Sequence, residues 1–181
     1  MAELRYMREE EFVGHFSMRD FLESCDRAFV LYGKGEIANP PREERVEKRE
    51  GLDYFRLDMP AEWPGLYRMR KIIEEYSDVG AGHLARREAY IELEDLRAGR
   101  AVRLDAGYIT DMRTGAAAAL ALRYTSASAV RRIGLVGTGR IARNIALACD
   151  VVFALEELRC TSRKEETRQK FAELIAPQIE A

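Results

Sequence analysis

The amino-acid sequence predicts an α/β protein in which an α+β domain over residues 1–130 precedes the first half of a parallel α/β domain over residues 131–181. Two observations carry this prediction. Apolar stretches with the period of a strand alternate with stretches of helical period. The C-terminal segment then runs from a short apolar strand through a glycine-rich turn into a helix and a second strand. Hydrophobic residues make up 47% of the 181 residues, which is enough to bury a core.

The N-terminal domain opens with a helix predicted over residues 19–32, where apolar residues recur at helical spacing. Ser17 is suited to cap its start and Gly33 to end it. The prolines of residues 39–41 force an extended or turning chain. Residues 42–50 alternate in the sign of charge and predict a solvated element.

Strands follow in the middle of the chain. Residues 54–59 alternate with an apolar side and predict a strand, which residues 60–65 should break. Residues 66–76 are ambiguous between strand and helix. Residues 88–94 and 100–105 predict a hairpin joined by a turn that contains Gly99.

A helix predicted over residues 110–124 is rich in alanine and apolar on most faces, which favours a buried position. Thr110 could cap its start. The small polar residues 125–130 mark a candidate junction between the two domains. A last helix is predicted over residues 163–175, with Phe171, Leu174 and Ile175 on one face.

The glycine-rich turn follows the apolar strand 133–136 and opens a helix that is followed by a second strand over residues 158–160. Residues 137–142 read G-x-G-x-x-A, a variant of the dinucleotide-binding fingerprint of the Rossmann fold, and the strand–turn–helix context is the one that the fingerprint needs. The alternative is a glycine turn with only a structural role. The chain has room for two strands of this fold, so half of the domain is expected.

Each position of the fingerprint has a chemical reason. Gly137 permits the tight turn, Gly139 lets a diphosphate approach the backbone, and Ala142 lets helix and strand pack closely. The helix N-terminus offers unpaired N–H groups and partial positive charge to phosphate. The predicted cofactor-binding residues of this loop are Gly137, Thr138, Gly139, Arg140 and Ile141.

The end of the second strand predicts the choice of cofactor. A carboxylate there would accept hydrogen bonds from the ribose of NAD, but the strand runs into Thr161, Ser162, Arg163 and Lys164. Arg163 and Lys164 would attract a 2′-phosphate, and Ser162 could donate a hydrogen bond to it. We therefore expect NADP(H) to be preferred over NAD(H). The alternative is that both cations merely begin a solvated helix.

Composition excludes other classes of function. The net charge of −2 and a pI of about 5.9 argue against nucleic acid as a partner. No apolar run is long enough for a membrane span. The three cysteines are widely spaced, which fits reduced thiols in a cytoplasmic protein. The two histidines and the cysteines do not cluster at ligand spacing, so no metal site is expected.

The sequence resembles the ornithine cyclodeaminase/mu-crystallin family. The resemblance extends over nearly the whole chain, although residues 65–87 depart from the family pattern. The stretches that carry it are Pro40-Pro41-Arg42, Asp58-Met59-Pro60, Gly99-Arg100-Ala101-Val102, Leu104-Asp105-Ala106-Gly107, Ile109 to Ala117 with its Arg-Thr-Gly-Ala motif, and Arg132 to Ala142.

The resemblance implies a dimerising substrate domain followed by a Rossmann domain. It implies hydride transfer between NAD(P) and the α-carbon of a small amino or imino acid, and a homodimer. One alternative within the family is a lyase that converts ornithine to proline and ammonia. Another is a non-catalytic, crystallin-like protein that binds a dinucleotide or small ligand.

The resemblance also implies basic residues that clamp the substrate carboxylate. Arg113 matches the Arg-Thr-Gly motif, Arg42 (with Arg45 as its rival) matches the arginine after the prolines, and Lys71 matches a family lysine. Thr114 is assigned to the cofactor. We expect Arg113 to lie in the first turn of its helix and to grip a carboxylate with two hydrogen bonds. The family's acid/base carboxylate belongs to a part absent here, so the catalytic residue is unknown and the 181 residues alone should show no turnover.

Overall fold

The computed structural model describes residues 4–78, 80, 82–126 and 129–179. The chain divides into two compact units. We call Met1–Val13 with Val30–Tyr108 the first unit, and Gly14–Phe29 with Ile109–Ala181 the second unit. Helices and strands together confirm the predicted α/β class. The boundary after residue 130, predicted between substrate and cofactor domains, stays a prediction.

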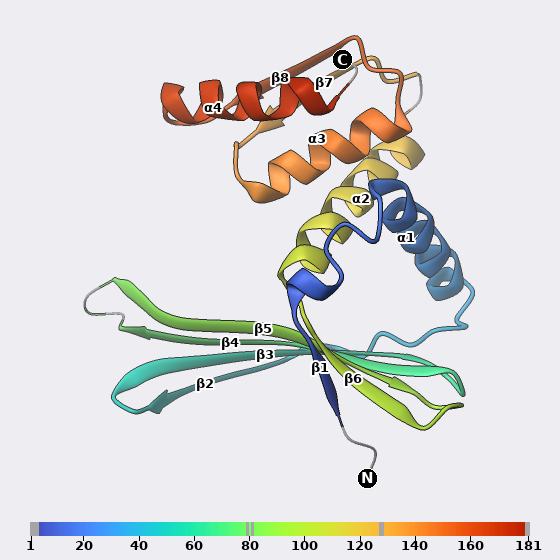
Figure 1. Cartoon of the computed structure of the whole chain (residues 1–181), viewed down its shortest axis with the longest axis vertical. Coiled ribbons are helices and arrows are strands. Elements are labelled where there is room, and N and C mark those ends of the chain that lie inside the picture. The colour runs from blue at the N-terminus through green and yellow to red at the C-terminus, as the bar shows by residue number, and fades with distance from the viewer. Residues whose placement is uncertain (1–3, 79, 81, 127–128, 180–181) are drawn as a thin grey trace. The chain divides into compact units, whose positions relative to one another are not determined.

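A six-stranded sheet forms most of the first unit (Figure 1). Its order is β1-β6-β5-β4-β3-β2, and every neighbouring pair is antiparallel except β1 with β6. The predicted hairpin is confirmed in β5 and β6, where Gly99 has a φ of 61° in the turn. The strands are β1 (Arg5–Met7), β2 (Glu43–Arg49), β3 (Leu52–Trp63), β4 (Tyr67–Asp78), β5 (His83–Asp95) and β6 (Arg100–Asp105), and a short helix η1 (Glu9–Glu11) follows β1.

The two faces of this sheet differ in character. What we call the apolar face carries Phe55, Leu57, Met59, Met69, Ile73, Ile91, Leu93, Val102 and Leu104. The polar face carries a network in which the Glu74 carboxylate accepts hydrogen bonds from the Tyr54 hydroxyl at 2.6 Å and from Arg56 at 2.8 Å. Asp58, also on this face, is buried and paired with Arg70. The alternation seen in residues 54–59 therefore separates an apolar surface from an ion-pair network.

The prediction that Pro60 to Gly65 break the strand is wrong for residues 60–63, because β3 continues to Trp63 and the turn lies at residues 64–66. Glu62 exchanges backbone hydrogen bonds with Ala38. In a strand, every second residue directs its N–H group to the same side, so the even-numbered residues of β3 direct theirs away from β4. Pro60 is one of these residues, and β2 pairs with β3 only as far as Asp58. A proline, which has no N–H group, therefore loses no sheet hydrogen bond at this position. The ambiguous residues 66–76 form strand β4.

The second unit holds most of the helices (Figure 1). Helix α1 begins where Ser17 and Asp20 exchange side-chain and backbone hydrogen bonds, as the predicted cap requires. A parallel two-stranded sheet forms from β7 and β8. The elements are α1 (Met18–Gly33), α2 (Gly107–Thr125), β7 (Arg132–Val136), α3 (Arg140–Val152), β8 (Glu157–Thr161), α4 (Glu165–Ile175) and the short η2 (Ala176–Gln178), with the end of α1 and the start of α2 in the first unit.

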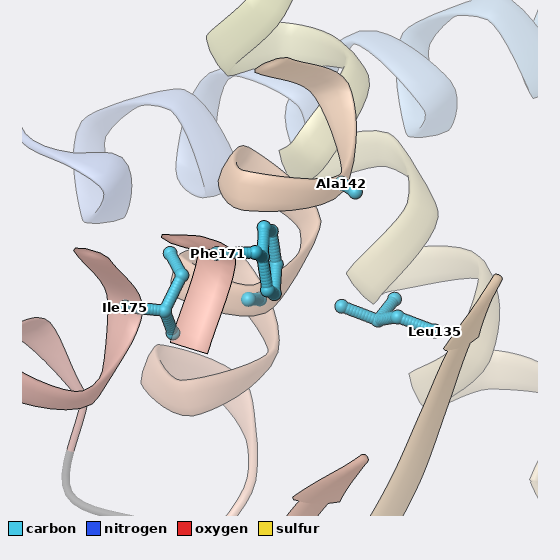
Figure 2. Packing of buried hydrophobic residues seen from close by; sticks show 5 residues of the cluster. Leu135, Ala142, Phe171 and Ile175 are labelled. Atoms are coloured by element: carbon cyan, nitrogen blue, oxygen red, sulfur yellow. The ribbon is translucent and has the colours of Figure 1, made fainter. Parts of the chain in front are cut away.

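A small core joins the strands and helices of this C-terminal segment. Figure 2 shows Leu135 of β7, Ala142 of α3, and Phe171 and Ile175 of α4 around it, and all four are buried. Ala142 at the end of the fingerprint therefore packs as expected. Leu174, expected on the same face of α4, is instead 45% exposed.

Helix α2 begins at Gly107, three residues before the predicted cap Thr110. The Glu9 carboxylate accepts a hydrogen bond from the N–H of Tyr108 at 2.9 Å and so caps the helix from a distant part of the sequence. As a result Arg113 lies in the second turn, not in the first turn beside unpaired N–H groups.

Among the described residues, no helix is long and apolar enough to cross a membrane.

Candidate dinucleotide and substrate site

The glycine loop joins the end of β7 to the start of α3. Gly137 has a φ of 106°, a conformation that residues with a side chain rarely adopt, and its N–H donates to the carbonyl of Thr161 at 2.7 Å. This hydrogen bond continues the pairing of β7 with β8 past Val136. The loop is thereby anchored to the end of the second strand, where the residues predicted to choose the cofactor lie.

Gly139 needs a different explanation. Its φ of −86° suits any residue, and a Cβ added there would meet no atom of the chain within 4 Å. Neither backbone conformation nor internal packing requires glycine at this position. The open space beside it leaves room for a ligand to approach the backbone, as a diphosphate does in the fingerprint.

The N-terminus of α3 is open. Gly139 is its N-cap and provides no side-chain hydrogen bond to the first turn. Thr138 is half-buried, and Ile141 is 45% exposed. Arg140, the first residue of the helix, forms an ion pair with Asp111 of α2, with 3.2 Å between Nε and Oδ2.

The turn after β8 carries the remaining cofactor candidates. The Ser162 hydroxyl donates to the carbonyl of Lys164 at 3.1 Å, and the carbonyl of Ser162 accepts from Arg168 at 2.6 Å. Arg163 and Lys164 are exposed, and neither forms an ion pair with another described residue. The turn is thus held by hydrogen bonds that leave both cations at its surface.

The Arg-Thr-Gly motif lies on α2. The Arg113 side chain is exposed, whereas Gly115 is buried. The Thr114 hydroxyl donates to the carbonyl of Thr110 at 2.6 Å, so it would have to leave that carbonyl in order to donate to a phosphate. A Cβ on Gly115 would collide with the backbone carbonyl of Asn144 in α3. This glycine therefore lets α2 cross close to the helix that begins at the glycine loop.

Lys71 and Arg42 belong to the first unit. Lys71 is only 9% exposed and sits on the apolar face, opposite Met59 in β3 and Ile91 in β5. It is therefore not a solvated lysine. Arg42 is exposed and pairs with Glu44 at 3.0 Å. Extending the β2–β3 register by one residue puts Arg42 opposite Met59, so roughly 10 Å, or two strand spacings, separates its backbone from that of Lys71.

The predicted site residues thus fall into two groups. Arg113 and Thr114 share the second unit with the glycine loop and the Ser162–Lys164 turn, while Arg42, its rival Arg45, and Lys71 lie in the first unit. Arg45 pairs with Glu47 on the opposite, polar face. In the described part of the chain, no three histidine, cysteine or acidic residues gather as a metal site would require.

Sequence reasoning missed two residues here. Glu9 caps α2 across 99 residues of sequence. Asp111 pairs with an arginine on another helix, and its only sequence signal is its place two residues before Arg113. Neither contact follows from local spacing, because both depend on how segments distant in sequence fold together.

Comparison with known proteins finds relatives of similar sequence and of similar fold. A Δ1-pyrroline-2-carboxylate reductase of Bacillus cereus is 33% identical over 86 residues, which is 47% of this chain and 26% of the relative. An archaeal alanine dehydrogenase, solved as a dimer with bound NAD, is 26% identical with a TM-score of 0.79 and covers 96% of this chain. A Thermococcus litoralis Δ1-pyrroline-2-carboxylate reductase, solved with NADH and L-proline, is 25% identical with a TM-score of 0.78 and also covers 96%.

The chain spans about half the length of the two solved proteins, 53% and 54%. Their similarity supports the predicted α/β fold with a Rossmann-like segment. The sequence profile of one family matches residues 5–181, which is almost the entire chain. The chain therefore belongs to the ornithine cyclodeaminase/mu-crystallin family.

Proposed function

We propose that the protein binds a nicotinamide dinucleotide at the loop Gly137–Ile141 and transfers hydride at the α-carbon of a small amino or imino acid. Gly139 is the observation that carries the proposal, because it is the second glycine of the fingerprint, where a diphosphate approaches the backbone, and the space beside it is open. The N–H groups at the start of α3 and the backbone at Gly139 would hold the diphosphate. The bound nicotinamide would supply or accept the hydride.

The cofactor we propose is NADP(H) in preference to NAD(H). In this reading, Arg163 and Lys164 pair with the 2′-phosphate, and the Ser162 hydroxyl donates to it after leaving the carbonyl of Lys164. No carboxylate lies between the end of β8 at Thr161 and the start of α4 at Glu165 to repel that phosphate. The dinucleotide-bound relatives were solved with NAD and NADH, so this preference would distinguish the protein from them.

For the substrate, we propose that Arg113 with Lys71 and Arg42 binds the carboxylate. Arginine matches the two oxygens of a carboxylate with two parallel hydrogen bonds, and this fixes the α-carbon for hydride transfer. The relatives named for alanine and for pyrroline-2-carboxylate act on small molecules of this class. We also propose a homodimer. A cytoplasmic location, expected from unpaired cysteines, stays a prediction.

Titration of NADP(H) and NAD(H) in low salt tests the cofactor proposal. Gly139→Ala should weaken binding of both on the order of tenfold or more while leaving the melting temperature unchanged, since the methyl group meets only the ligand. Gly134→Ala is the matched control, because Gly134 also has open space around it but lies within β7. Arg163→Asp should shift preference toward NAD(H). Unchanged affinity in Gly139→Ala would contradict the site.

A further inference from the structure

Arg140 occupies an unfavourable electrostatic position. It is the first residue of α3, at the end of the helix where the backbone dipoles already give partial positive charge. The first turn of α3 contains no acidic residue to offset this charge. A cation here needs an anion from elsewhere, and the structure supplies one in Asp111.

Asp111 is well placed to be that counterion. Its side chain is 15% exposed on α2, whereas the Arg140 side chain is 75% exposed. The carboxylate is therefore the fixed partner and the guanidinium the movable one. The close crossing of α2 and α3 at Gly115 and Asn144 holds the helix that carries Asp111 against α3.

We propose that Asp111 competes with the cofactor diphosphate for the Arg140 guanidinium and thereby lowers affinity for the dinucleotide. The inference rests on the proposed function, since it assigns Arg140 to the phosphate groups. When a diphosphate occupies the loop, Arg140 pairs with it, and the carboxylate of Asp111 loses its partner and faces added negative charge. Asp111 is in this sense a residue that tunes the cofactor site by acting through Arg140.

A double-mutant cycle tests the competition. Affinity for NADP(H) is measured for the protein and for Asp111→Asn, Arg140→Gln and the double variant. Asp111→Asn should tighten binding on the order of threefold, because it removes a charge interaction of surface strength. In the Arg140→Gln background the same change should have little effect. The gain should shrink in high salt.

Glu156→Gln is the control, since Glu156 forms an ion pair with Arg131 at 2.6 Å in the same unit but at the start of β7. It should leave cofactor affinity unchanged. Weaker binding in Asp111→Asn, or an equal effect in both backgrounds, overturns the proposal and indicates that the ion pair only stabilises the helices. If the ion pair has only that structural role, Asp111→Asn should lower the melting temperature without tightening the binding of NADP(H).

Inorganic pyrophosphate serves as a second probe and separates this inference from the proposed function. If neither dinucleotide binds, the proposed function fails, and the same cycle read with pyrophosphate still decides the role of Asp111. Tightening of pyrophosphate binding in Asp111→Asn that depends on Arg140 supports the competition. Absence of pyrophosphate binding in every variant overturns it.

Discussion

At the scale of single residues, three glycines of the second unit serve three different purposes. Gly137 is required by its positive φ, Gly115 by the carbonyl of Asn144, and Gly139 by neither. The sequence predicts the tight turn at Gly137 and an approach of diphosphate at Gly139, but it gives no separate reason for the glycine at position 115. The surroundings of each glycine separate a conformational need at Gly137 from a packing need at Gly115 and from open space at Gly139, where we propose that a ligand binds.

Substitution of Arg113 tests whether this residue binds the substrate carboxylate. In a chain that carries a whole cofactor domain, Arg113→Ala should lower kcat/KM, with a loss of transition-state stabilisation of about 3 kcal/mol, because a charge-assisted, two-bond contact with the carboxylate is lost. Steady-state kinetics with the amino or imino acid substrate measures the loss. Arg123→Ala removes an exposed arginine from the last turn of the same helix and should leave kcat/KM near its original value. Equal kinetics in Arg113→Ala would remove this residue from the clamp.

At the scale of elements, the crossing of α2 and α3 links the Arg-Thr-Gly motif to the glycine loop. Gly115→Ala should lower stability by about 1–3 kcal/mol, because the methyl group must push the Asn144 backbone away. Thermal unfolding measures the change. Gly33→Ala, at the end of α1 where a Cβ meets nothing within 4 Å, is the control and should not destabilise. A Gly115→Ala variant as stable as the original would mean that the two helices separate freely.

The pairing of β3 with β4 on the polar face predicts a dependence on pH. Burial opposes ionisation of Glu74, but hydrogen bonds from Tyr54 and Arg56 outweigh it and lower the pKa of this carboxyl. A lowered pKa means that the stabilisation is complete above the unfolded value of about 4.3 and is lost as pH falls through the folded value.

Melting temperature measured from pH 6 down to pH 3 should therefore fall less steeply in Glu74→Gln than in the original protein. Tyr54→Phe removes one of the two donors and should show an intermediate slope. Identical slopes in all three proteins would show that the carboxylate gains nothing from its partners.

Sequence predicted those elements whose signals are local. The capped helix α1, the hairpin of β5 and β6, and the run from β7 through α3 to β8 follow from periodicity, capping residues and glycine spacing. The extension of β3 through Pro60 did not, because it depends on which side of the strand lacks a neighbour. Helix α2 begins earlier than the sequence predicts, because its cap comes from Glu9. In the candidate site, the ion pair of Asp111 with Arg140 does not follow from the sequence, because it joins two different helices, and the roles of the motif residues stay predictions.

At the scale of the whole molecule, association is the property to measure. Several large apolar side chains are more than half exposed, among them Phe29, Tyr32, Val46 and Tyr124. Where such side chains form a contiguous patch, they commonly pack against a partner. We expect sedimentation of the purified protein at micromolar concentration to give a dimer that dissociates only on strong dilution. A clean monomer across that range would count against the homodimer.

The first strand in the chain pairs with the last strand of its sheet, and this has a consequence for synthesis. β1 must wait for β6, and Glu9 must wait 99 residues for Tyr108. On the ribosome, the antiparallel strands from β2 to β6 can therefore pair in order of emergence while β6 still presents an unpaired edge. When β1 pairs with β6, it covers that edge, and Glu9, which follows β1, caps α2. A nascent chain that has lost those few early residues would complete a sheet and yet leave the helix bearing Arg113 without its cap.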